Sequence, residues 1–156
     1  KRLSGDKSKT ISSIIFTAKQ YEKIFKKIQT VVLLQPTSPF RSKKSILIAY
    51  RKYIKANKKK SIVSVMKSNF KQKTSFLIKN KKLQSCSKNH KSKISFQFNG
   101  NFYISSLDFL KKYKSFYHKN KTLAAHQKSK FLSIDIDTNH DFELAGNYIK
   151  HLSKIT

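Results

Sequence analysis

A three-layer α/β sandwich is the fold class that the sequence predicts, and three features of residues 30–66 indicate it. Apolar residues recur between residues 46 and 54 at positions i, i+3, i+4, i+7 and i+8, the spacing of one helix face. Two apolar runs, 31–34 and 62–66, flank this helix and are short enough to be strands. The short connections favour parallel strands joined by a crossover helix, with helices on both faces of the sheet.

A helix is expected before the first strand. Thr10 is a suitable N-cap, and the residues that follow it place an apolar face along a helix ending near residue 27; these are Ile11, Ile14, Ile15, Ala18 and Phe25. A strand over 30–35 comes next. Its run from Val31 to Leu34 is unbroken and half β-branched, so we expect it to be buried on both faces.

Two prolines interrupt the chain directly after this strand, and they are the only prolines present. Pro36 and Pro39 fix φ and remove two backbone donors, which predicts a stiff loop. The loop presents Gln35, Thr37, Ser38 and Arg41 at the carboxyl end of the strand, where open α/β sheets bind ligands. The alternative is a connection without chemistry.

The remaining elements follow from shorter signals. Ser42 is expected to cap the helix over 43–54, residues 76–78 form a short strand, and 79–93 form a basic loop. The alternating apolar residues of 94–98 predict a strand that ends in a turn at Asn99-Gly100, and β structure resumes at 102–104. Ser106 caps a short helix, and 131–134 is read as a strand. Thr138 caps a last helix whose buried face consists of Phe142, Ala145, Tyr148, Ile149 and Leu152.

The net charge, the single cysteine and the lengths of the apolar stretches limit the classes of protein to which this chain can belong. The 156 residues carry a formal net charge of +28, and only three of the 35 basic residues are arginine. Such a surface attracts polyanions and membranes nonspecifically, although the spread of the lysines also fits a general compositional bias. The lone Cys86 excludes an internal disulfide, and no apolar stretch is long enough for a membrane span. A cytoplasmic setting is expected, and the first residue, Lys1, suggests a processed chain or a fragment.

Two carboxylates give the clearest chemical signal. Asp135 and Asp137 follow the predicted strand 131–134 and are separated by one residue, so they are expected to point the same way. Paired carboxylates suit Mg²⁺ that is shared with nucleotide phosphates. The compatible alternative is capping, in which Asp137, Thr138 and Asp141 oppose the dipole of the last helix. Neither a zinc-binding histidine pattern, a glycine-rich phosphate loop nor a serine-hydrolase elbow is present.

Three segments together resemble the acylneuraminate cytidylyltransferases, the family of CMP-N-acetylneuraminic acid synthetases and their pseudaminic- and legionaminic-acid relatives. They are 33–41 (LLQPTSPFR), 99–104 (NGNFYI) and 133–138 (SIDIDT) with Asp141, and 3–6 (LSGD) with Thr10 resembles the segment that precedes them. The resemblance implies a Rossmann-like nucleotide-diphospho-sugar transferase fold, three-layer α/β/α, lacking its first strands and nucleotide-binding loop. Residues 1–156 would be the C-terminal two-thirds of that domain.

The implied reaction transfers CMP from CTP to a nonulosonic (sialic-like) acid and releases pyrophosphate, with Mg²⁺ as cofactor. The full-length protein would be a homodimer, and this fragment is expected to be inactive alone. By position, the metal ligands are Asp135 and Asp137, the catalytic residues are Gln35 and Asp137, and the nucleotide contact is Thr10. The sugar-binding residues are Gln35, Lys73, Tyr103, Phe116 and Tyr117.

Two positions depart from the family pattern. Lys88, Asn89 and Lys91 occupy the neighbourhood where an arginine for the sugar carboxylate is expected, and Gln97 stands where many relatives have a basic residue. Core packing is the alternative role for the three aromatic residues. A basic module that binds nucleic acid or other polyanions is the alternative function.

Overall fold

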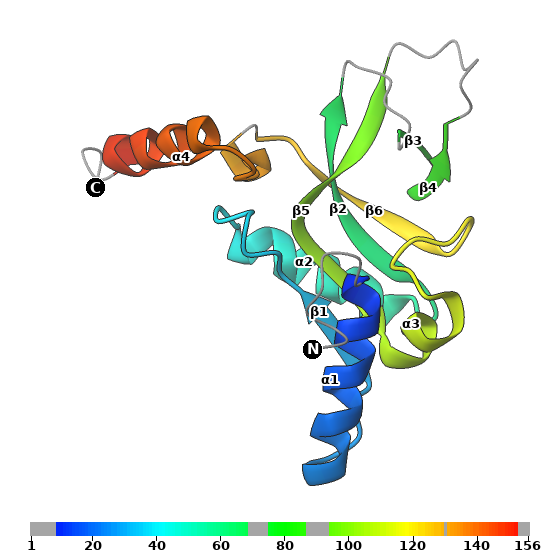
Figure 1. The fold of residues 1–156 in the computed structure, drawn as a ribbon. Helices are drawn as coiled ribbons and strands as arrows, with labels where there is room; N and C mark the ends of the chain where they lie inside the picture. The colour runs from blue at the N-terminus through cyan, green and yellow to red at the C-terminus, as the bar shows by residue number, and fades with distance from the viewer. Residues whose placement is uncertain (1–8, 69–74, 87–93, 130, 153–156) are drawn as a thin grey trace.

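The computed structural model describes residues 9–68, 75–86, 94–129 and 131–152, which contain four α-helices and one sheet of six strands (Figure 1). In chain order the elements are α1 (Thr10–Ile24), β1 (Thr30–Leu33), α2 (Lys43–Lys55), β2 (Ser61–Ser68), β3 (Phe76–Lys79), β4 (Lys82–Ser85), β5 (Ser95–Ser106), α3 (Leu107–Tyr113), β6 (Thr122–Gln127), a 3₁₀ turn η1 (Phe131–Ser133) and α4 (Asn139–Leu152).

The sheet closes into a five-stranded mixed barrel, so the predicted three-layer, Rossmann-like α/β/α fold is wrong. The strand order is β1-β5-β2-β6-β4-β3, and a further pairing of β3 with β5 closes the ring. Among the pairings of the described strands, β2 with β6 is the one that is parallel, and β5 runs antiparallel to both β1 and β2. Each of two strand pairings in the ring consists of one residue pair. Phe76 of β3 pairs with Phe96 of β5, and Lys82 of β4 pairs with Leu123 of β6.

The hairpin of β3 and β4 accounts for much of this error, since residues 79–93 were expected to be a loop. Asn80 and Lys81 both have positive φ, 50° and 63°, as a tight hairpin turn requires. An Asn-Lys pair is a weaker turn signal than Asn-Gly, and the β4 sequence Lys-Leu-Gln-Ser has a single apolar residue. The local sequence therefore does not predict the hairpin of β3 and β4, because it does not show with which strands β4 pairs.

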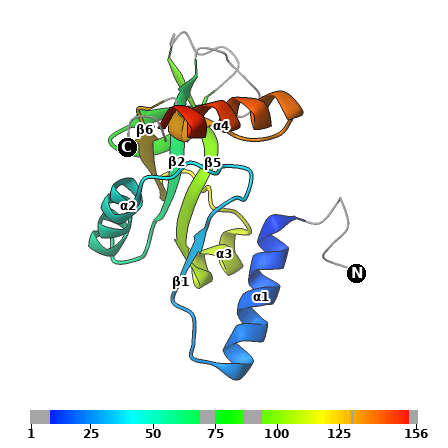
Figure 2. The ribbon, with the colours of Figure 1, turned by 90° about the vertical axis from the view of Figure 1, so that its left-hand side faces the viewer.

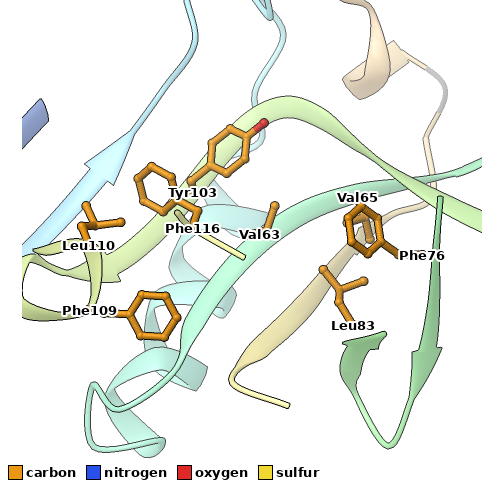
Figure 3. Packing of buried hydrophobic residues seen from close by; sticks show 8 residues of the cluster. All are labelled: Val63, Val65, Phe76, Leu83, Tyr103, Phe109, Leu110 and Phe116. Atoms are coloured by element: carbon orange, nitrogen blue, oxygen red, sulfur yellow. The ribbon is translucent and has the colours of Figure 1, made fainter. Parts of the chain in front are cut away.

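Apolar clusters lie on the two faces of the sheet. The larger one fills the barrel side and consists of Val63, Val65, Phe76, Leu83, Tyr103, Phe109, Leu110 and Phe116 (Figure 3). Isoleucines of α1 and residues of α3 pack against it. The smaller cluster lies under α2 and contains Ala49, Tyr53, Ile62, Phe102, Ile104 and Ala125. Figure 2 shows α2 and α1 on opposite sides of the strands.

The middle of β5 departs from regular pairing, and this irregularity positions the candidate site. Val63 pairs with Tyr103 and Val65 pairs with Phe98, so one residue of β2 faces four of β5. Gly100 has φ +69° within this bulge. The Asn99-Gly100 signal was read as a turn, but β5 continues through it from Ser95 to Ser106. A bulge bends a strand and redirects its side chains, and here it brings the strand toward the proline loop.

The helix starts follow local chemistry. Ser42 Oγ accepts from the Ser45 amide at 3.2 Å and Ser106 Oγ accepts from the Phe109 amide at 3.1 Å, which confirms both predicted caps. Thr10 is instead the first helical residue of α1, and the N-cap, Lys9, makes no side-chain cap bond. α1 ends at Ile24, and Phe25, which was expected on the buried face, is exposed.

Strand β1 lies at an edge of the sheet, so the prediction of burial on both faces is wrong. Among the described strands it pairs with β5 alone, and Val32 is 44% exposed. The apolar run predicted the strand but not its neighbours. Between β1 and α1 lies a groove of about 430 Å³ lined mainly by apolar atoms.

The predicted strand 131–134 is absent. Residues Phe131–Ser133 form the turn η1, and the strand in this part of the chain is β6, which was not expected. Helix α4 begins where expected but extends away from the barrel (Figure 1). Ala145 is buried, whereas Phe142 (68% exposed) and Ile149 lie largely in solvent, so most of the predicted buried face is wrong. The Leu152 side chain lies outside the described part of the structure.

Candidate functional site

Three distant segments meet beside the β5 bulge: the proline loop 35–41, residues 99–103 of β5, and residues 132–137. We refer to this meeting point as the polar junction. The proline loop is anchored to β5 by the Arg41 side chain, whose Nε donates to the Asn101 carbonyl at 3.0 Å. Arg41 Nη2 also donates to the Gln35 carbonyl, and the Ser38 amide donates to the same carbonyl at 3.1 Å. Arg41 therefore fixes the loop shape.

Ser38 lies at the centre of the polar junction and is completely buried. Its Oγ lies 3.1 Å from both the Asn99 carbonyl oxygen and Asp135 Oδ1, so its single hydroxyl proton is shared between these two acceptors. A methyl group at Gly100 would come within 2.3 Å of Ser38 Oγ and 2.8 Å of Gln35 Oε1. Only glycine allows this close approach, and it also accommodates the positive φ. The serine connects all three segments.

Gln35 and Tyr103 form the second contact of the polar junction. The Tyr103 hydroxyl donates to Gln35 Oε1 at 3.1 Å, which leaves the Gln35 amide nitrogen to act as a donor elsewhere. Burial raises the pKa of Tyr103 to about 12, and the negative charge of Asp135 acts in the same direction, against a lowering backbone hydrogen bond from Gly100. Tyr103 therefore remains a neutral donor at physiological pH.

The two aspartates occupy different environments. Both lie in an irregular segment after η1, not after a strand, and this segment is held by the Ile136 amide, which donates to the Thr37 carbonyl at 2.8 Å. Asp135 is half-buried against Ser38, whereas Asp137 is exposed. The prediction that they follow a strand is therefore wrong, although the chain does bring Asp135 to the proline loop.

The capping interpretation of this segment is confirmed for the side chains of Thr138 and Asp141. Thr138 Oγ1 accepts from the Asp141 amide at 3.2 Å, and Asp141 Oδ2 accepts from the Thr138 amide at 2.9 Å, which is a reciprocal capping box. Hydrogen bonding by Thr138 lowers the pKa of the exposed Asp141 carboxyl. The Asp137 amide also donates to Asp141 Oδ2, at 3.3 Å, so its backbone belongs to the cap.

Two asparagines of β5 contribute to the polar junction although sequence reasoning gave them no role. Asn99 Nδ2 and Asn101 Nδ2 donate to the Leu132 carbonyl at 3.3 and 2.9 Å, and Asn101 Nδ2 also donates to the Phe40 carbonyl at 2.6 Å. They join η1 to the proline loop. The ring of Phe131 packs on Phe40, with centroids 4.2 Å apart. The Asn-Gly-Asn sequence was the feature that could have indicated these contacts, but it was interpreted as a turn.

The other candidate residues lie outside this contact network. Phe116 is 6% exposed in the barrel core, where its ring packs on Tyr103 with centroids 5.1 Å apart. Tyr117 packs on Phe76 and Phe98, and its hydroxyl accepts from the Ser85 amide. Core packing accounts for both rings. Thr10 lines the groove between α1 and β1, and Lys73 lies outside the described residues.

The donor set suits a magnesium ion only in part. Within the described residues, no three side chains of the His, Cys, Asp or Glu type come together as metal ligands. Asp135 and Asp137 therefore supply at most two carboxylates. Mg²⁺ is commonly held by one or two carboxylates and completes its shell with water and substrate phosphates, so two carboxylates match the protein's usual share of its ligands.

Comparisons with known proteins leave the family open. No model of a protein family matches the chain, and a search of curated proteins finds no match. No helix in the described ranges is long and apolar enough to cross a membrane. The residues of the polar junction are therefore the basis for a functional proposal.

Proposed function

We propose that this chain is part of a nucleotidyltransferase, an enzyme that transfers CMP from CTP to a nonulosonic acid and releases pyrophosphate. One observation carries the proposal: the three segments that resemble the acylneuraminate cytidylyltransferases meet through Ser38, Gly100 and Asp135. These segments are separated by about 60 and 30 residues in the sequence. The proposal rests on the site and not on the fold class, since one chemistry can occur on different folds.

The chain's own groups have complementary roles in this proposal. The Gln35 amide nitrogen, oriented by the Tyr103 hydroxyl, donates to an oxygen of the sugar acid beside the reacting centre. The anomeric hydroxyl of the sugar attacks the α-phosphate of CTP, and pyrophosphate leaves. Asp135 and Asp137 would hold Mg²⁺, which when bound neutralises charge on the phosphates. Asp137 has the more exposed carboxylate of the two and would face the nucleotide.

The first test is product formation. The chain, extended at its N-terminus by the first strands and nucleotide-binding loop that the resemblance implies, is incubated with CTP, MgCl₂ and N-acetylneuraminic, pseudaminic or legionaminic acid, and CMP-sugar and pyrophosphate are followed by mass spectrometry and a coupled phosphate assay. We expect Mg²⁺-dependent product with at least one acid, and loss of product in Asp135→Asn, which keeps an acceptor for Ser38. Asp108→Asn, a carboxylate at the start of α3, is the matched control and should retain activity.

A second test addresses Gln35. Gln35→Ala should lower kcat by roughly ten-fold or more, because one positioned donor is lost, while the melting temperature changes little. Absence of product with all three acids under saturating CTP, or wild-type turnover in Asp135→Asn, would overturn the proposal.

A polyanion-binding module is the second candidate, and the net charge of +28 favours it. Binding to a nucleic-acid duplex would then weaken steeply as salt rises, without preference for CTP over other nucleotides. A CTP-selective, Mg²⁺-dependent interaction that persists at moderate salt would instead favour the transferase.

A further inference from the structure

We propose that Ser38 is a positioning residue that orients the Asp135 carboxylate for divalent metal binding. This inference rests on the proposed function, because Asp135 is taken as a metal ligand there. Nothing in the sequence assigned a role to Ser38 beyond its place in the proline loop. The argument comes from the contacts of its hydroxyl and from the packing that holds it.

The Ser38 side chain has no freedom to rotate away from Asp135. It is fully buried, its Oγ lies 3.1 Å from both Asp135 Oδ1 and the Asn99 carbonyl, and Gly100 closes the remaining side. The loop that carries it is fixed by Arg41. A hydroxyl held in this way defines where one carboxylate oxygen sits.

Asp135 in turn needs such an anchor, because the segment that carries it is irregular. Residues 134–138 lie between η1 and α4, and their backbone contact to the proline loop is the Ile136 amide on the Thr37 carbonyl. With Oδ1 held by Ser38, the second oxygen of Asp135 is the one presented to a cation. Partners of this kind typically change metal affinity by about 10- to 100-fold when removed.

The test measures Mn²⁺, a spectroscopic substitute for Mg²⁺, by electron paramagnetic resonance of the free ion. Ser38→Ala should raise the Kd for Mn²⁺ by about ten-fold or more. Ser133→Ala is the matched control, because its hydroxyl donates to the Ser129 carbonyl in the neighbouring stretch and not to Asp135. Ser133→Ala should leave the Kd for Mn²⁺ unchanged.

A double-mutant cycle separates positioning from a general structural role. If Ser38 acts through Asp135, Ser38→Ala should add nothing to the loss already caused by Asp135→Asn. An equal further loss in that background would overturn the proposal. Unchanged Mn²⁺ binding in Ser38→Ala alone would overturn it too, while the metal role of Asp135 would stand. Unchanged binding in Asp135→Asn would instead refute the metal site and, with it, the inference.

A measurement on the unaltered protein covers the case in which Ser38→Ala does not fold. Mn²⁺ broadens amide resonances near its site, so substoichiometric Mn²⁺ should broaden the signals of Ser38 and Gly100 together with that of Asp135. Broadening at Asp137 without any at Ser38 would place the ion away from the serine and overturn the proposal.

Discussion

The polar junction and the groove between α1 and β1 differ in how their side chains are packed and in how much of them solvent reaches. At the polar junction, buried hydroxyl, amide and guanidinium groups join three segments, and Gly100 permits contacts that no other residue would allow. At the groove, apolar side chains such as Val32 remain open to solvent, and β1 has no strand on its outer side among the described residues. Close polar contacts fix geometry, whereas an open apolar edge fixes little.

The largest expected effect comes from filling the space at Gly100. Gly100→Ala combines a strained positive φ with overlap against Ser38 and Gln35, so it should destabilise the fold by roughly 3 kcal/mol. Gly146→Ala in α4 meets no atom within 4 Å and should stabilise its helix by about 1 kcal/mol. Chemical denaturation of both variants checks this contrast. Equal effects would mean that the polar junction is not tightly packed.

The second prediction concerns Tyr103 and pH. Its pKa of about 12 lies above the ordinary value of 10, so the fold favours the neutral phenol. This contribution to stability is complete below pH 10 and is lost as pH rises toward 12. The ultraviolet absorbance of tyrosinate, taken as the difference between wild type and Tyr103→Phe, should show the late titration. Asp135→Asn should move it to lower pH, and Asp108→Asn should not.

A smaller effect is expected where the polar junction passes into α4. Thr138→Ala removes the cap and should cost about 1 kcal/mol, seen as faster amide exchange in α4 with little change in the barrel. The lowered pKa of Asp141 implies that its support of α4 is present above the ordinary carboxyl pKa and is lost as pH falls through the lowered one. Exchange that rises equally in β2 and β5 would contradict this local role.

The smallest effect belongs to the groove. Val32→Thr on the exposed face of β1 should change the free energy of unfolding by no more than about 0.5 kcal/mol. Leu33→Ala in the same strand packs against the barrel cluster and should cost more, about 2 kcal/mol. If Val32→Thr proves as costly as Leu33→Ala, the groove is covered in solution, and size measurements would then show whether a second copy covers it.

Part of the candidate site could be predicted from the sequence. The prolines and the polar residues around them indicated a shaped loop, and the paired aspartates indicated a carboxylate site near it. Asp135 does contact that loop, through Ser38. The contact with Gly100 was not foreseen, because the Asn-Gly pair has the same local signature in a turn and in a bulge.

The amino-acid sequence by itself determined the elements whose causes are local. Ser42, Ser106 and Thr138 begin their helices because each side chain bonds an amide three residues away. Only the tertiary structure decided that β5 lies antiparallel between β1 and β2, that β3 and β4 close a barrel, and that α4 extends outward. Strand pairing joins residues far apart in the chain, and its free energy depends on neighbours that no local pattern specifies.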